Sequence, residues 1–195
     1  MRHIGIVLFP GTEELDAVGP WEVLSCWTGA YPQDGWAVST LSRAGGPVLC
    51  AKGLTLQAHS SYDDAPPLDV LLYPGGQGTR PLLRDEAELD WVRRQRAAVP
   101  LLTSVCTGSL VYAAAGLLAG RPATTHWGSL DVLARLDPSI DVRPDERFVD
   151  DGDVITAAGV SAGIDMALHL VARLAGVERA REVRRHIQYD PAPPV

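Results

Sequence analysis

The sequence predicts an α/β fold in which helices cover both faces of a mostly parallel sheet. Three short apolar runs, at residues 3–9, 68–73 and 101–105, are rich in branched side chains and typical of strands buried on both faces. Segments with helical character lie between them, and a turn follows each run. This alternation predicts a doubly wound sandwich that binds ligands beyond the carboxyl ends of its strands.

The elements of the first half follow from apolar runs and the turn residues between them. The strand at residues 3–9 ends at Pro10, and a helix is expected around residues 20–24, with Pro20 in its first turn. Residues 36–41 and 54–58 are candidate strands separated by a turn at residues 45–47. The strand at 68–73 stops at a Pro-Gly-Gly turn, and helical spacing of apolar residues predicts a helix over 86–98.

The second half continues the alternation of strand and helix. The strand at residues 101–105 precedes an alanine-rich helix over 109–119 and another helix over 125–136. Short strands are expected at 147–149 and 154–157, on either side of an Asp-Asp-Gly-Asp turn. Helices over 160–174 and 178–187 complete a single domain spanning 1–195, whose proline-rich tail at 190–195 cannot enter a helix or a sheet interior.

Composition and charge narrow the classes of function. The 195 residues are 46% hydrophobic and 21% charged, which is ordinary for one globular domain with a sizeable core. A formal net charge of -7 disfavours nucleic-acid and anionic-membrane partners. No apolar run reaches the ~18 residues that span a bilayer, and the chain begins in a strand rather than in a signal peptide. Cys26, Cys50 and Cys106 lack disulfide-framework or metal spacing, so a reducing, cytoplasmic location is expected.

Cys106 is the strongest candidate for chemistry. It follows the 101–105 strand directly, at a turn into a helix, where backbone N–H groups and the helix dipole favour thiolate over thiol. With Gly108 two residues later, the run has the layout of a hydrolase nucleophile elbow in which Cys replaces Ser. The alternative is that Cys106 is a small buried hydrophobic residue, the commoner use of a free cysteine.

Two further turns are expected to meet Cys106 at the carboxyl edge of the sheet. In the first, Asp16 either exchanges a proton with the sulfur or simply caps a helix, and Glu13 is expected to be solvated. In the second, Gly75 and Gly76 let the backbone approach a ligand and point N–H groups at negative charge, as in an oxyanion hole. A plain tight turn is the alternative use of these glycines.

The histidines do not indicate a metal site. His126, in the run Ala-Thr-Thr-His-Trp-Gly, is expected to be structural or pocket-lining rather than the partner of Cys106. The other four histidines have no mutual ligand spacing, so no metal ion is predicted. Trp21, Trp127 and Ile155 are further candidates for the pocket wall, and Asp165 lies in an apolar helix with its role open.

Taken together, these segments resemble the DJ-1/PfpI (ThiJ/PfpI) superfamily over essentially the whole chain. The matching runs include Leu8-Phe-Pro10 with Leu15-Asp16, Pro74-Gly-Gly76, Thr103-Ser-Val-Cys-Thr-Gly-Ser-Leu110, Ala123-Thr-Thr-His-Trp127 and Ala162-Gly-Ile-Asp-Met-Ala-Leu168. The resemblance implies a flavodoxin-like sandwich of the class I glutamine amidotransferase type, usually a homodimer.

Within the superfamily, the chain looks most like the isonitrile (isocyanide) hydratases. That resemblance implies that Cys106 is the nucleophile, that Asp16 is the neighbouring acid, and that Thr107 faces the substrate or a water with its backbone N–H and hydroxyl. The protease-like branch typically has His at the position of Thr107. The DJ-1 branch usually has Glu at the position of Asp16, so this chain departs from both.

The implied reaction converts a small-molecule isonitrile and water to an N-substituted formamide through a covalent cysteine thioimidate. This chemistry requires no metal or organic cofactor. The alternative is a ligand or oxidative-stress sensor related to the sensor domain of AraC-type regulators, in which Cys106 is oxidised reversibly. Because the chain stops at Val195 with net negative charge, no DNA-reading half is expected.

Overall fold

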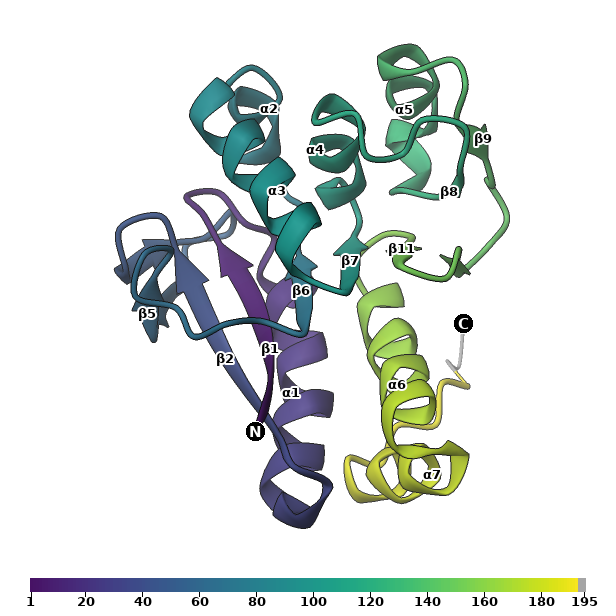
Figure 1. Cartoon of the computed structure of the whole chain (residues 1–195). Coiled ribbons are helices and arrows are strands. Elements are labelled where there is room, and N and C mark those ends of the chain that lie inside the picture. Colours follow the sequence, from purple (N-terminus) through teal and green to yellow (C-terminus); the bar gives the residue numbers. More distant parts are fainter. Residues whose placement is uncertain (193–195) are drawn as a thin grey trace.

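The computed structural model describes residues 1–192 and contains a central sheet with helices on both faces (Figure 1). The strand order across this sheet is β10 (Phe148–Asp150), β11 (Val154–Ala157), β7 (Leu101–Val105), β6 (Val70–Tyr73), β1 (Arg2–Leu8), β2 (Trp36–Ser42) and β5 (Ser60–Ser61). Every pairing is parallel except that of β10 with β11. Without the short edge strands, the order is second, first, third, fourth, fifth, as in flavodoxin. The predicted fold class is confirmed.

Two groups of helices cover the two faces of the sheet. Helices α1 (Glu14–Ala30), α6 (Ala162–Ala175) and α7 (Val177–His186) pack on one face, and α3 (Glu86–Ala98) and α4 (Gly108–Ala114) cover the other (Figure 1). Side chains along β1 alternate between the two faces of the sheet: Ile4 and Ile6 pack against the first group of helices, and Val7 packs against the second. Because both faces of the strand are buried, its sequence reads as a continuous apolar run.

Shorter elements join the main layers. They are η1 (Pro32–Asp34), β3 (Gly46–Leu49), β4 (Thr55–Ala58), α2 (Thr79–Leu82), β8 (Pro122–Ala123), η2 (Trp127–Ser129), α5 (Leu130–Leu136) and β9 (Asp141–Val142). Strands β3 and β4 form a hairpin beside the main sheet. Gly11 N–H donates to Leu49 O (2.9 Å) and Ala51 N–H donates to Thr12 O (2.8 Å), so this hairpin supports the loop between β1 and α1.

Several predicted boundaries need correction. Helix α1 is longer than predicted and holds Pro20 in its interior, because buried side chains on both sides of Pro20 offset the loss of one helical N–H donor. Helix α4 ends at Ala114 because Gly116 adopts a left-handed φ of +80°. The predicted turn at 45–47 runs into β3, which begins at Gly46, and the helix predicted from 125 begins only at Leu130.

Other boundaries are confirmed. The predicted bounds of α3, β7 and β11 agree with the structure. Pro191 and Ala192 lie outside helix and strand, as predicted for the tail, and the rest of the tail, 193–195, lies outside the described residues.

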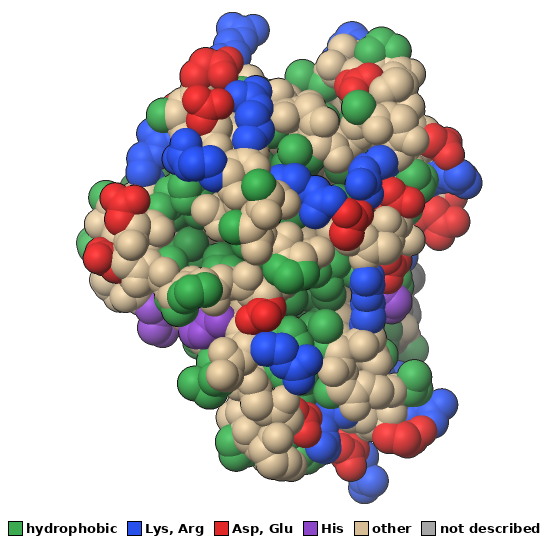
Figure 2. Space-filling model, in the orientation of Figure 1, with side chains coloured by type: hydrophobic (Ala, Val, Ile, Leu, Met, Phe, Trp, Pro, Cys, Tyr) green, Lys and Arg blue, Asp and Glu red, His purple; other side chains and the backbone are tan. Residues whose placement is uncertain are grey.

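The surface shows no concentration of one charge on the face seen in Figure 2. Acidic and basic side chains are interspersed there, with apolar side chains between them. This face therefore offers no continuous basic surface of the kind that follows a phosphate backbone. No helix within residues 1–192 has the length and apolar character needed to cross a membrane.

Candidate active site

The turn that holds Cys106 and the two turns predicted to meet it come together at the carboxyl ends of β1, β6 and β7. Gly75 N–H donates to Asp16 Oδ2 (2.9 Å), and Gly76 N–H donates to Thr107 Oγ1 (3.0 Å). Gly108 starts α4 directly against the end of β6, where a Cβ would lie 2.2 Å from the Tyr73 carbonyl oxygen. Strands β1 and β6 flank the point at which the strand order reverses, the usual ligand-binding position in such sheets.

Cys106 is held in a strained backbone conformation. Its φ is +57°, a left-handed value that non-glycine residues rarely adopt. Cys106 N–H bonds the carbonyls of Ala157 and Ala158 (both 3.1 Å), and its own carbonyl accepts from Thr125 Oγ1 (2.9 Å). Val160, whose backbone N–H reaches the sulfur, also has a positive φ, +49°. Strain of this kind persists only where the surroundings fix it, and it is concentrated at functional sites.

The Cys106 thiol is buried, with 5% of the residue exposed. Burial, followed by the negative charge of Asp16, raises the pKa of the thiol to about 12. Hydrogen bonds from the N–H groups of Thr107 and Val160 lower the pKa of the thiol, but by less than burial raises it. The prediction that the helix start favours a thiolate is therefore wrong, because loss of water disfavours the charged sulfur more strongly. Burial therefore favours the protonated thiol over the thiolate.

Asp16 is the carboxylic acid beside this thiol. Its side chain is fully buried, and burial raises its pKa to about 7 although Gly75 N–H and the Cys106 thiol both lower it. Oδ2 accepts the Gly75 hydrogen bond, whereas Oδ1 has no partner among the described groups. The carboxyl group does not cap its own helix, since its bond goes to the loop after β6. A free carboxyl oxygen next to a thiol is suited to accept the thiol proton.

A cavity of about 310 Å³ opens onto Cys106. Its wall is formed by Glu13, Gly76, Gln77, Arg80, Cys106, Thr107, His126, Trp127, Gly128, Ser129 and Val160. The volume is sufficient for a small organic molecule. Asp16 does not line the cavity, so a ligand would meet the sulfur while the carboxyl group stays behind it.

The glycine turn does not have the arrangement predicted for an oxyanion hole. The N–H groups of Gly75 and Gly76 are already bonded to Asp16 and Thr107, so neither is free for a ligand. Glycine is needed at position 75 instead because the two turns pack closely there, and a Cβ would lie 2.4 Å from Thr107 N. The Thr107 hydroxyl is likewise engaged, by Gly76 N–H and by Thr79 Oγ1 (3.1 Å), which leaves only its backbone N–H for the sulfur.

The predicted wall residues divide into two groups. His126 and Trp127 line the cavity, and Trp127 is 80% exposed. Trp21 stacks on His59, with ring centroids 5.4 Å apart, in a separate hollow against α1. Ile155 is fully buried, because alternation along β11 points its side chain into the core under α1, α6 and α7, and it lies near the start of β11 rather than at the carboxyl end. Trp21 and Ile155 are therefore not part of the wall.

Sequence reasoning missed Arg80, Gln77, Glu13 and Val160 as cavity residues. The sequence did carry a signal for Gln77 and Arg80, because both lie just after the Pro-Gly-Gly turn that ends a buried strand. Glu13 was expected to be solvated, yet only 17% of its side chain is exposed and it pairs with Lys52. Asp165 lies elsewhere, on α6, where it accepts hydrogen bonds from Arg147 Nε (2.6 Å) and from the Tyr189 hydroxyl (3.0 Å).

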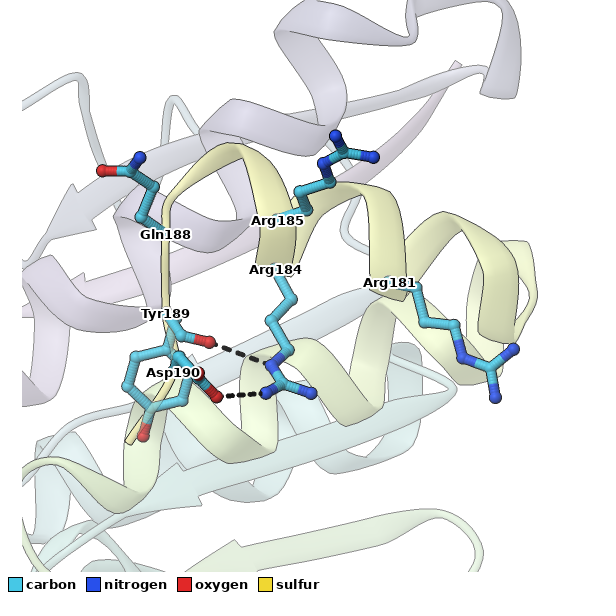
Figure 3. Close-up of a pocket in the computed structure, with 6 residues that line it drawn as sticks. All are labelled: Arg181, Arg184, Arg185, Gln188, Tyr189 and Asp190. Carbon is cyan, nitrogen blue, oxygen red and sulfur yellow. Dashed lines mark hydrogen bonds and ion pairs between the residues drawn. The ribbon is translucent and has the colours of Figure 1, made fainter. Parts of the chain in front are cut away.

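A third hollow lies at α7 and holds none of the predicted catalytic residues (Figure 3). It is lined by Arg181, Arg184, Arg185, Gln188, Tyr189 and Asp190. The Arg184 side chain points toward the residues that follow α7, where it donates to Tyr189 O (2.9 Å) and Asp190 Oδ1 (2.7 Å). Over residues 1–192, no three His, Cys, Asp or Glu side chains are grouped so as to hold a metal ion.

Comparison with known proteins connects this geometry to characterised relatives. The model of the DJ-1/PfpI family matches residues 2–173. An isonitrile hydratase from Pseudomonas putida is 44% identical over 192 residues, covering 98% of this chain and 80% of the hydratase. The HTH-type transcriptional regulator CdhR from Pseudomonas aeruginosa is 33% identical over 178 residues, covering 91% of this chain and 52% of the regulator.

Solved structures show the same architecture. A ThiJ/PfpI family protein from Pseudomonas syringae superposes with a TM-score of 0.86 at 34% identity, covering 100% of this chain and 77% of that one. An AraC family transcriptional regulator from Pseudomonas putida superposes with a TM-score of 0.83 at 24% identity, covering 96% of this chain and 100% of that one, which is a likeness of fold alone.

Proposed function

The chain belongs to the DJ-1/PfpI family, and from this premise we propose that it is an isonitrile hydratase. The observation that carries the proposal is the buried Cys106 thiol beside the unpartnered Oδ1 of Asp16, at the wall of a cavity of small-molecule size. The 44% identity to the hydratase of Pseudomonas putida supports the substrate class. An isonitrile needs a soft nucleophile at its terminal carbon and a proton for the same carbon, and this pair can supply both.

The first half of the proposed reaction forms the covalent intermediate. Asp16, as a carboxylate, accepts the thiol proton through Oδ1 while the sulfur bonds the terminal carbon of the isonitrile. The N–H groups of Thr107 and Val160 stabilise the negative charge on sulfur during this step. Asp16 then returns the proton to the former isonitrile carbon, which gives the thioimidate Cys–S–CH=N–R.

The second half releases the product. Water adds to the thioimidate carbon from the cavity, and the adduct then collapses by breaking the C–S bond. The nitrogen and the leaving sulfur take up the two protons, so that R–NH–CHO departs and the thiol is restored. His126 is placed to orient substrate or water, since it lines the cavity and its Nδ1 accepts the Gly128 N–H (3.1 Å), which leaves Nε2 as the ring atom that donates.

The proposal is tested by incubating the protein with cyclohexyl isonitrile in ¹⁸O-labelled water. We expect catalytic formation of N-cyclohexylformamide carrying the label, and an acid-quenched adduct on Cys106 heavier by the mass of the isonitrile. A protein that reacts once at Cys106 without turnover would instead support the sensor alternative, for which the 33% identity to a transcriptional regulator is the relevant observation.

The pH dependence of kcat/KM should report Asp16. Because the carboxylate form must accept the thiol proton, activity should fall about tenfold per pH unit below the pKa of about 7 and level off above it. Asp16→Asn should lower kcat by about 100- to 10,000-fold and remove this acidic limb. Asp131→Asn, at an exposed position of α5, is the matched control and should keep the wild-type profile. An acidic limb that survived in Asp16→Asn would assign it to another group.

We further propose a cytoplasmic homodimer. The three cysteines are free, which fits a reducing compartment. Leu15, Leu49 and Leu54 expose 37%, 61% and 50% of their surfaces, and the hydrogen bond from Lys52 N–H to Glu14 Oε1 (2.6 Å) holds the β3–β4 hairpin against the start of α1. Sedimentation should give twice the chain mass of 20.9 kDa, and a double Lys substitution at Leu49 and Leu54 should give monomer. Val177→Lys on α7 is the control, and a monomeric wild type would contradict the proposal.

A further inference from the structure

Arg80 is a charged residue in the cavity wall that the proposed reaction does not use. It lies on α2, directly after the loop that follows β6. Arg80 Nη1 donates to Thr79 Oγ1 (2.9 Å), which lies 3.1 Å from Thr107 Oγ1. Thr79 is fully buried, so this chain of contacts ties the guanidinium to the residue next to Cys106.

The charge of Arg80 is not neutralised by the cavity itself. Within residues 1–192, Arg80 forms no ion pair, and its hydrogen bond to Thr79 is to a neutral hydroxyl. Glu13, the carboxylate in the cavity wall, pairs with Lys52 instead. Asp16 is buried behind the sulfur and is bonded to Gly75. The cavity therefore presents a positive group with no matching negative one.

Other donors surround the same space. The Nε2–H of His126 and the amide of Gln77 belong to the wall, and Trp127 adds an exposed aromatic surface. Arg80 is exposed, so a plain alkyl isonitrile would leave its guanidinium to water alone. A carboxylate would satisfy it through charge-assisted hydrogen bonds, because the planar fork of Arg matches the two carboxylate oxygens.

We propose that Arg80 makes the cavity selective for isonitriles that carry a carboxylate. The isonitrile carbon meets Cys106, the hydrocarbon or aryl body lies toward Trp127, and the carboxylate binds Arg80. This inference rests on the proposed hydratase function and names the substrate class of that same cavity. Arg80 acts here in recognition, so its loss should lower kcat/KM more for charged substrates than for neutral ones.

The test compares 4-isocyanobenzoate with the neutral, similarly shaped 4-isocyanobenzamide. Wild type should prefer the carboxylate by about 10- to 100-fold in kcat/KM, the range expected for a hydrogen bond to a charged group. Arg80→Gln should reduce this ratio to about one, with the larger loss of kcat/KM falling on the carboxylate substrate. Arg84→Gln removes the same charge from a position that is exposed like Arg80 but lies outside the cavity wall, and it should keep the preference.

A binding measurement gives a second readout that does not depend on turnover. In the Cys106→Ala background, 4-formamidobenzoate should bind at least about tenfold more tightly than 4-formamidobenzamide, and Arg80→Gln should remove the difference. Equal kcat/KM for the two isonitriles in wild type, or a preference that survives Arg80→Gln, would overturn the role of Arg80 alone. If wild type hydrates neither isonitrile nor cyclohexyl isonitrile, the hydratase function fails and the inference fails with it.

Discussion

Replacing Cys106 with alanine should lower kcat for formamide formation at least about 1000-fold, to near the uncatalysed rate. The thiol is the group in the cavity wall that stands beside a base with a free oxygen. The wall also holds the hydroxyls of Thr107 and Ser129, but the first is bonded to Gly76 and Thr79, and neither is a soft nucleophile. Without the sulfur, no thioimidate can form.

The matched controls for this experiment are already in the chain. Cys26→Ala and Cys50→Ala remove thiols that lie outside the cavity wall and should keep nearly full activity. Cys106→Ala should also keep its fold, because a left-handed φ strains alanine and cysteine alike. Circular dichroism would verify that point. A Cys106→Ala variant with more than about a tenth of wild-type kcat would mean that Asp16 activates water directly, without covalent catalysis.

The sheet could be predicted from sequence because each buried strand carries its signal locally. The runs at 3–9, 68–73 and 101–105 are apolar on both faces, and the turns that end them place Asp16, Gly75 and Cys106 at one edge by the geometry of a parallel sheet. Some of the boundaries that failed are those where packing overrides a local rule. Pro20 inside α1 is one example, tolerated because both neighbouring turns of the helix are buried.

The electrostatics of the cysteine could not be predicted in the same way. A thiol after a strand and before a helix suggests a lowered pKa, but the sign of the shift depends on how much water reaches the sulfur, which is a property of the whole fold. The same holds for the N–H groups of Gly75 and Gly76, whose partners come from other segments of the chain. Arg80 was missed because its contact with the Cys106 cavity joins residues far apart in sequence.

Asp16→Asn should stabilise the folded protein at neutral and alkaline pH, although it removes the catalytic base. Burial raises the pKa of Asp16 from 3.8 to about 7, so between these values the folded protein binds more protons than the unfolded chain. Stability therefore falls as pH rises through this window and stays low above it. The full penalty approaches about 4 kcal/mol, since a tenfold change in proton affinity is worth about 1.36 kcal/mol. Asparagine can keep an oxygen on Gly75 N–H without the buried charge.

Denaturant unfolding of wild type and Asp16→Asn measures this penalty directly. The advantage of the variant should grow by about 2–3 kcal/mol between about pH 5 and pH 8, because other titrating groups are shared and cancel in the difference. Asp131→Asn should show a small difference that does not change with pH. If the Asp16→Asn advantage were also independent of pH, the carboxyl group would titrate normally and could not exchange protons near neutrality. The buried charge that costs stability is thus the same feature that sets the Asp16 pKa near 7, where one carboxyl group can both take and return the Cys106 proton.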